Sequence, residues 1–260
     1  MSALPTASNH HRTGLIAGLL NGLIGIGGGI VIVPALLGRG YTPQQAVGTS
    51  LATVVVLSGI AFFGHAAITG IALDAIAFAG VVLGGVTGSL LGGWLLARIS
   101  RRNMMIIFSL LLFVVALRLV LQGLGLASIH ALWPAGATTL GYAGVGFVAG
   151  ILSGVFGVGG GALVMLGLVV LFGLPVQQGL PVALAANVTN AIAGAVNHSV
   201  AGRVRATDIT RLIPAALVGI AVGTALAVWL PGDTMRVIIG GFFCAQGIRM
   251  LVQIRHSTSM

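Results

Sequence analysis

Two glycine runs inside apolar sequence are the residues of this chain best suited to bind a ligand. The first, NGLIGIGGG, covers Asn21 to Gly29, and the second, SGVFGVGGG, covers Ser153 to Gly161. Glycine weakens a helix by about 1 kcal/mol relative to alanine, so each run is predicted to break a helix. In lipid, a broken backbone is tolerated only where protein buries it or where it lines a cavity. The two runs therefore predict a substrate site.

The chemistry that these breaks offer is the binding of an anion. The first amide groups of a helix have no intrahelical partner, and together they carry about half a positive charge. Glycine lets an anion approach those amides without an intervening side chain. We predict that two half-helices, one starting at each run, face a shared anion midway through the membrane. The predicted substrate-binding residues are Asn21, Gly25, Gly27, Gly28, Gly29, Thr49, Ser50, Thr53, Ser153, Gly157, Gly159, Gly160, Gly161, Asn187 and Asn190.

Structural roles remain open for part of this set. Serine and threonine in a membrane helix often donate to a carbonyl one turn earlier, which is the alternative role for Thr49, Ser50 and Thr53. Asn187 and Asn190 lie three residues apart on one helix face, and they also suit a polar clasp between helices. Another set of glycines is assigned to close helix packing: Gly84, Gly85, Gly88, Gly92 and Gly93.

Two matched pairs of residues are candidates for gating or proton coupling. His65 and His198 end the second and sixth apolar stretches. Arg118 and Arg249 occupy equivalent positions further along each half. The alternatives are interfacial histidines and arginines that extend to the membrane surface. No metal-ligand spacing and no cofactor motif is present in the sequence, so neither a metal nor a cofactor is predicted.

The ionisable residues also indicate which energy source drives transport. No carboxylate lies deep in any apolar stretch, where proton- and sodium-coupled transporters usually place one. We therefore expect an anion uniport driven by the membrane potential and by concentration. Proton coupling through His65 or His198 is the second hypothesis.

The composition is that of an integral membrane protein. Hydrophobic residues make up 57% of the 260 residues, charged residues make up 6%, and the mean hydropathy is +1.13. The net charge of +9 comes from 12 basic residues, all arginine, and 3 aspartates. The arginines lie in short links between apolar stretches, where they determine topology, so nucleic-acid binding is not expected. Residues 1–12 have no cleavable signal pattern, and the first apolar stretch is expected to remain.

Eight apolar stretches are candidate membrane segments, four in each half of the chain. A crossing helix needs about 20 residues. The halves align with Gly18 set against Gly150 and, after the inserted Val176, with His65 set against His198. We predict an all-α membrane protein, one transmembrane unit made of a first repeat (1–121), a link (122–133) and a second repeat (134–260). The stretches cover residues 14–37, 46–64, 74–97, 104–121, 134–172, 180–197, 210–230 and 236–253.

The arginines favour one folding of the two glycine-containing stretches. If residues 14–37 and 134–172 both cross the membrane completely, the arginines divide seven to five between its sides. If each glycine run is the tip of a re-entrant hairpin, ten arginines share one side and only Arg118 and Arg236 face the other, as the positive-inside rule requires. Each half then makes three net crossings, so the second repeat is predicted to be inverted. Whether residues 134–172 form one broken span or a full span plus a half-helix stays open.

Several motifs point together to one family. Besides the paired glycine runs, they are the segment YTPQQAVGTSL from Tyr41 to Leu51, the pair Gly64-His65, and the LARI and ALRL segments that begin at Leu96 and Ala116. With these motifs the chain resembles the sulfite exporter TauE/SafE family of membrane transporters over almost its full length. The resemblance implies export of a small sulfur-containing anion such as sulfite or a sulfonate like sulfoacetate. In the second half, PVAL from Pro181 replaces the GTSL element, so hydroxyl ligands are expected from the first half only.

Other functional classes fit the sequence less well. An intramembrane enzyme would need paired aspartates, a nucleophile turn or a metal motif, and the sequence has none of them, so no enzyme is predicted. An anion channel or an importer of the same architecture stays open as the alternative. We expect a bacterial inner-membrane protein with both termini in the cytoplasm. The expected partners are a small anion and the lipid bilayer, with a homodimer left open.

Overall fold

The protein is described by a computed structural model of residues 7–69, 75–126, 138–172, 174 and 176–258. These residues form ten α helices and no strand, which confirms the predicted all-α class. Residues 1–6 of the predicted first repeat, 127–133 of the predicted link and 134–137 of the second repeat lie outside the described residues. The helices are α1 (Ala7–Ile24), α2 (Gly29–Gly38), α3 (Pro43–Thr69), α4 (Ala75–Leu96), α5 (Arg101–Gly123), α6 (Thr138–Phe156), α7 (Gly161–Phe172), α8 (Val176–Val200), α9 (Ala206–Trp229) and α10 (Gly232–Thr258).

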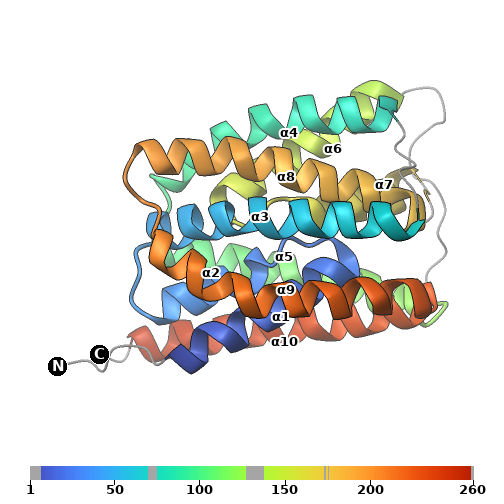
Figure 1. The fold of residues 1–260 in the computed structure, drawn as a ribbon. Coiled ribbons are helices and arrows are strands. Elements are labelled where there is room, and N and C mark those ends of the chain that lie inside the picture. Colours follow the sequence, from blue (N-terminus) through green and yellow to red (C-terminus); the bar gives the residue numbers. More distant parts are fainter. Residues whose placement is uncertain (1–6, 70–74, 127–137, 173, 175, 259–260) are drawn as a thin grey trace.

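The helices have the length and composition of membrane segments. Among the described residues, 7 helices are long and apolar enough to cross a bilayer, namely α3, α4, α5, α6, α8, α9 and α10. Helix α1 begins and α10 ends at the same end of the bundle (Figure 1). The chain is therefore a multi-pass membrane protein.

The first and fifth apolar stretches are each broken into two helices that turn back on themselves. After α2, Arg39 Nη2 donates to Thr13 Oγ1 near the start of α1, at 3.4 Å. In the second half, the Tyr142 ring early in α6 packs on the Phe172 ring at the end of α7, with centroids 4.4 Å apart. Each pair thus starts and ends at one side of the bundle (Figure 1). We call them the first hairpin (α1–α2) and the second hairpin (α6–α7).

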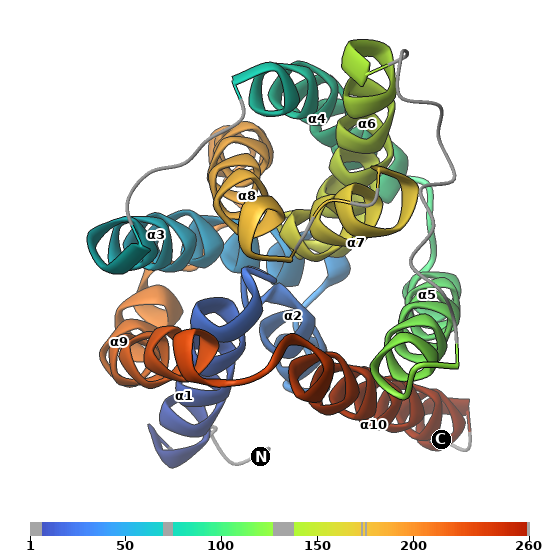
Figure 2. The ribbon, with the colours of Figure 1, turned by 90° about the vertical axis from the view of Figure 1, so that its right-hand side faces the viewer.

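Helices at equivalent positions in the two halves run antiparallel where they meet. Along α3 and α8, Gly48 lies against His198 and Ser58 bonds to Asn187, so the residue numbers run in opposite directions. Helices α5 and α10 pair in the same way, with Gly123 beside Val237. Figure 2 shows both pairs as neighbours around the hairpins. This packing is consistent with the predicted inversion of the second repeat.

Each hairpin is held against a helix of the other half by glycine. A Cβ added to Gly18 of α1 would lie 2.0 Å from the Ala216 carbonyl of α9, and one added to Gly84 of α4 would lie 2.0 Å from the Ala143 carbonyl of α6. No side chain fits at such contacts, so the backbones approach closely. Gly84, Gly88 and Gly92 line the α4–α6 contact, in agreement with their predicted packing role.

Candidate functional site

The two glycine runs adopt the same left-handed backbone at equivalent positions. In the first run the φ angles of Gly25, Gly27 and Gly28 are 71°, 85° and 71°, and the corresponding angles in the second run are 70°, 85° and 87°. L-residues with side chains rarely adopt these angles, so glycine is required to end one helix and start the next. The second-run glycines are Gly157, Gly159 and Gly160.

The tips of the two hairpins touch each other through a reciprocal contact. A Cβ added to Gly29 would lie 2.2 Å from the Gly157 carbonyl oxygen, and one added to Gly161 would lie 2.2 Å from the Gly25 carbonyl oxygen. Helix α2 has 10 residues and is about 15 Å long, roughly half of a 30 Å hydrocarbon core. The starts of α2 and α7 therefore lie together in the middle of the bundle.

Asn187 of α8 connects both breaks. Its Oδ1 accepts from the Gly161 amide at 3.1 Å, and its Nδ2 donates to the Gly25 carbonyl at 3.3 Å. Nδ2 also donates to Ser58 Oγ of α3 at 2.9 Å. With no exposed surface, this side chain uses its amide entirely within the protein. Asn187 is thus a clasp between the hairpins, which was the alternative to its predicted role as a ligand.

Asn21 and Ser58 extend the same hydrogen-bond network to the first hairpin. Asn21 Oδ1 accepts from the Gly27 amide at 2.7 Å and from Ser58 Oγ at 3.2 Å. Sequence reasoning missed Ser58, although it is the one hydroxyl-bearing residue in the second half of the 46–64 stretch. A lone serine in a membrane helix usually bonds to its own backbone. Its position in the sequence therefore did not indicate that Ser58 connects Asn21 to Asn187.

Several buried polar atoms beside the breaks have no partner in the described part of the chain. Asn190 has no exposed surface, and both its Oδ1 and its Nδ2 are unpaired. A Cβ on Gly160 would lie 3.1 Å from Asn190 Nδ2, so this amide lies against the break before α7. The Ser153 hydroxyl and Asn21 Nδ2 are unpaired as well. Buried donors without partners are uncommon in proteins, and donors grouped around helix starts match an anion.

The predicted hydroxyl residues of α3 divide into one that reaches a break and two that do not. Ser50 Oγ donates to the Gly157 carbonyl at 2.7 Å. Thr53 donates to the Thr49 carbonyl one turn earlier, at 2.8 Å, and Thr49 Oγ1 accepts from the Arg205 amide at 3.0 Å. Thr49 therefore fixes the segment before α9 (Ala206–Trp229), whereas Thr53 bonds within its own helix.

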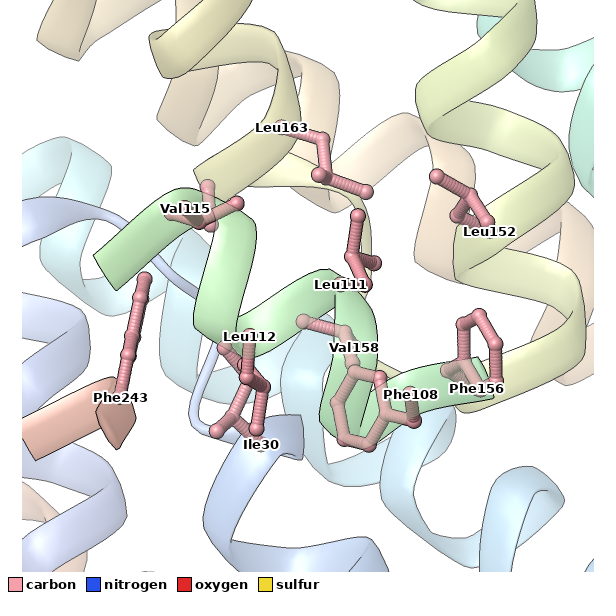
Figure 3. A pocket seen from close by; sticks show the side chains of 11 residues that line it. Ile30, Phe108, Leu111, Leu112, Val115, Leu152, Phe156, Val158, Leu163 and Phe243 are labelled. Carbon is pink, nitrogen blue, oxygen red and sulfur yellow. The ribbon is translucent and has the colours of Figure 1, made fainter. Parts of the chain in front are cut away.

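A cavity beside the helix starts is small and apolar (Figure 3). It has a volume of about 20 Å³, room for about one water molecule. Phe108 of α5 stacks on Phe156, with ring centroids 4.7 Å apart, and Phe243 of α10 lies across the cavity. Sulfite is larger than a water molecule and does not fit in this cavity.

Comparison with known proteins places this architecture in a family. The model of the family described as sulfite exporter TauE/SafE matches residues 12–254. The chain belongs to this family. It is also 29% identical over 238 residues to the probable membrane transporter protein YunE of Bacillus subtilis (strain 168), an alignment that covers 82% of this chain and 85% of YunE. No solved structure matches.

In this TauE/SafE member, the two histidines proposed for gating lie in different surroundings. His65 Nε2 lies 2.7 Å from the Gly22 carbonyl, one turn before the first break. His198 is 1% exposed, lies beside Gly48, and has no partner for either ring nitrogen among the described residues. His198 therefore makes no hydrogen bond to the starts of α2 or α7 in the described part of the chain.

The two arginines also differ in their surroundings. Arg118 of α5 is half-buried, and its Nε has no partner among the described residues. Arg249 of α10 is exposed and lines a cavity beside the first hairpin. Within the described residues, no group of three or more His, Cys, Asp or Glu side chains could hold a metal ion.

A polar cluster ties the open end of the first hairpin to α9. Asp208 is 4% exposed, and its carboxylate lies 3.2 Å from His10 Nε2. The Tyr41 hydroxyl donates to the other carboxylate oxygen at 2.7 Å. Burial raises the pKa of Tyr41, and the hydrogen bond to Asp208 raises it further. Sequence analysis did not identify this cluster, because its members come from opposite halves of the chain.

Proposed function

We propose that this TauE/SafE transporter exports a small sulfur-containing anion, sulfite or an organosulfonate such as sulfoacetate. The observation that carries the proposal is the reciprocal contact between two glycine-started half-helices in the middle of the bundle. Each helix start carries a positive partial charge, and glycine allows the two starts to lie close together. A strongly hydrated cation would find no carboxylate among the described residues at this place.

The unpaired donors support an oxyanion as the ligand. Asn190 Nδ2, Asn21 Nδ2 and the Ser153 hydroxyl are buried beside the breaks without partners in the described part of the chain. One amide of each run already has a side-chain partner, since Gly27 donates to Asn21 Oδ1 and Gly161 donates to Asn187 Oδ1. Three sulfite oxygens offer enough acceptors for these groups. We assign the ligand contacts to these groups and to the amides of Gly29 and Gly160.

Transport then requires that space for the anion opens beside the helix starts toward each side in turn. The cavity of about 20 Å³ is lined by Phe108 of α5 and Phe243 of α10, together with residues at the starts of α2 and α7. Moving these two helices away from the hairpins would enlarge it without breaking the contact between the tips. Helices α5 and α10 are equivalent in the two halves, so such a movement suits alternating access between inverted repeats.

The energy for export comes, in this proposal, from the membrane potential. With both termini in the cytoplasm of a bacterial inner membrane, a negative interior favours the exit of an anion. The driving force is about 2.3 kcal/mol per charge per 100 mV, or about fifty-fold in concentration. An anion channel or an importer for another small anion is the alternative.

Flux measurements on the purified chain in proteoliposomes test the proposal. We expect saturable efflux of sulfite that shows counterflow and responds to an imposed potential. Flux that saturates but ignores voltage would remove the uniport and leave proton coupling, which a pH gradient then detects. Flux that neither saturates nor shows counterflow would identify a channel. Absence of flux for sulfite, sulfoacetate and sulfate would overturn the substrate class.

A further inference from the structure

A cavity lies beside each hairpin at equivalent positions in the two halves. The first, of about 440 Å³, lies between α1, α2 and α10. The second, of about 540 Å³, lies between α5, α6 and α7. When the two glycine runs are aligned, Gly144 and Leu171 of the second cavity correspond to Arg12 and Arg39 of the first. The repeated architecture therefore forms both cavities, but with different linings.

Three arginines from three different elements line the first cavity. They are Arg12 of α1, Arg39 directly after α2, and Arg249 of α10, and no acidic side chain is among the described lining residues. The described lining of the second cavity carries no charged side chain at all. Because the second cavity exists without charges, the arginines are not needed to form such a space. Three positive charges around one cavity suit a ligand that carries negative charge.

Two polar groups of the first cavity lack protein partners. Arg39 Nη1 is buried without a partner in the described part of the chain, while Nη2 donates to Thr13. Burial lowers the pKa of Arg39, an effect that the nearby Asp208 carboxylate opposes. Gln246 is 9% exposed, and its Oε1 has no partner among the described residues. An oxyanion would accept from Arg39 and, after rotation of the amide, from Gln246.

The first cavity leads toward the glycine break. It follows one face of α2 from Gly38 through Ala35 and Pro34 to Val31. These positions are spaced as neighbours on a helix surface and span about 10 Å. Val31 lies two residues after Gly29, where α2 starts. An anion that moves along this face from the arginines therefore arrives within one helix turn of the proposed transport site.

We propose that this cavity is an oxyanion vestibule, formed by Arg12, Arg39, Gln246 and Arg249, which holds a sulfite- or sulfonate-class anion and loads it onto the first hairpin. The inference rests on the proposed function. The vestibule opens on the arginine-rich side, which the positive-inside rule assigns to the cytoplasm, so it serves export. The apolar second cavity does not retain the anion after release. An anionic lipid headgroup has the same oxyanion chemistry and is the competing source.

Binding measured in nanodiscs separates these sources. The full chain is placed in nanodiscs of phosphatidylcholine alone or with phosphatidylglycerol, and sulfite binding is followed by calorimetry. In neutral lipid we expect the Arg12→Gln/Arg249→Gln double variant to bind sulfite at least tenfold more weakly. The matched control is Arg98→Gln/Arg102→Gln, which removes the same charge from exposed arginines outside the cavity lining. Melting temperatures establish that both double variants are folded.

Three outcomes would overturn the vestibule. The first is equal weakening in both double variants, which indicates general surface charge, and the second is no weakening in either. The third is that the wild type and the control variant retain bound phosphatidylglycerol, the cavity variant loses it, and sulfite does not displace it. The cavity would then be a lipid site. Failure of the proposed function is seen separately. If wild-type flux is absent while the binding difference persists, transport of this anion is wrong and the vestibule remains an oxyanion site.

Discussion

The two hairpins share a backbone but not their polar surroundings. Both breaks place three left-handed glycines at equivalent positions, and each tip touches the other. In both, the carbonyl that ends the first helix accepts from the opposite half: Gly157 from Ser50 and Gly25 from Asn187. Yet the Gly27 amide of the first run donates to Asn21 of its own hairpin, whereas the Gly161 amide of the second run donates to Asn187 of α8. The two breaks therefore have the same backbone conformation, but different side chains bond to them.

The difference originates in α3 and α8, the equivalent helices that flank the breaks. In the alignment that sets His65 against His198, Asn187 and Asn190 of α8 correspond to Val54 and Leu57 of α3. Their roles separate, because Asn187 is fully bonded and Asn190 has no partner among the described residues. One asparagine holds the two tips together and the other is free for a ligand.

The largest expected effect comes from the contact that the hairpins share. Gly29→Ala and Gly161→Ala each place a Cβ about 2.2 Å from a carbonyl oxygen of the other hairpin. Such a distance forces the tips apart, so we expect either variant to abolish sulfite flux in proteoliposomes. Gly241→Ala on α10, with open space around its Cβ, is the control and keeps wild-type flux.

The same experiment examines how far the two halves are equivalent. Size-exclusion profiles and melting curves establish that the variants are folded. Loss of flux in only one of them would show that the tips act independently. Normal flux in both would refute the role of the contact in transport.

A smaller effect is expected at Asn190, where a substitution should weaken sulfite binding but raise the stability of the protein. Asn190→Leu restores the residue type found at the equivalent position in the first half, and removes an unpaired buried amide. We expect sulfite affinity to fall about tenfold, the loss of roughly one hydrogen bond to a charged ligand. Without a buried unsatisfied group, the melting temperature should rise by about 2–4 °C for each kcal/mol gained.

Asn187→Leu is the matched comparison one turn away. It removes three hydrogen bonds and leaves the Gly161 amide and Gly25 carbonyl unsatisfied, so the melting temperature should fall. Thermal melts with and without sulfite measure both effects. A lower melting temperature for Asn190→Leu would instead identify Asn190 as a structural residue.

The hairpins could be predicted from sequence because their cause is local. Left-handed φ angles belong to glycine itself, and the arginine distribution indicated on which side the chain enters and leaves. The separate roles of Asn187 and Asn190 could not be predicted, since both lie on one helix face and differ only in tertiary partners. The meeting of Arg12 and Arg39 with Arg249 was hidden for the same reason, because α10 is the last helix of the chain.

The smallest effects are expected from two hydroxyl groups of α3. Ser50 bonds to the second half of the chain, whereas Thr53 bonds within its own helix. Ser50→Ala leaves the buried Gly157 carbonyl without its donor, a loss of about 1 kcal/mol, and should lower sulfite flux severalfold by loosening the second tip. Thr53→Val removes only a bond to the Thr49 carbonyl of the same helix, so its flux should stay within about twofold of wild type. Initial rates in proteoliposomes measure both. If Thr53→Val proves the more damaging of the two, Thr53 contacts the anion during transport, and the first half contributes a ligand whose hydroxyl bonds to its own backbone in this structure.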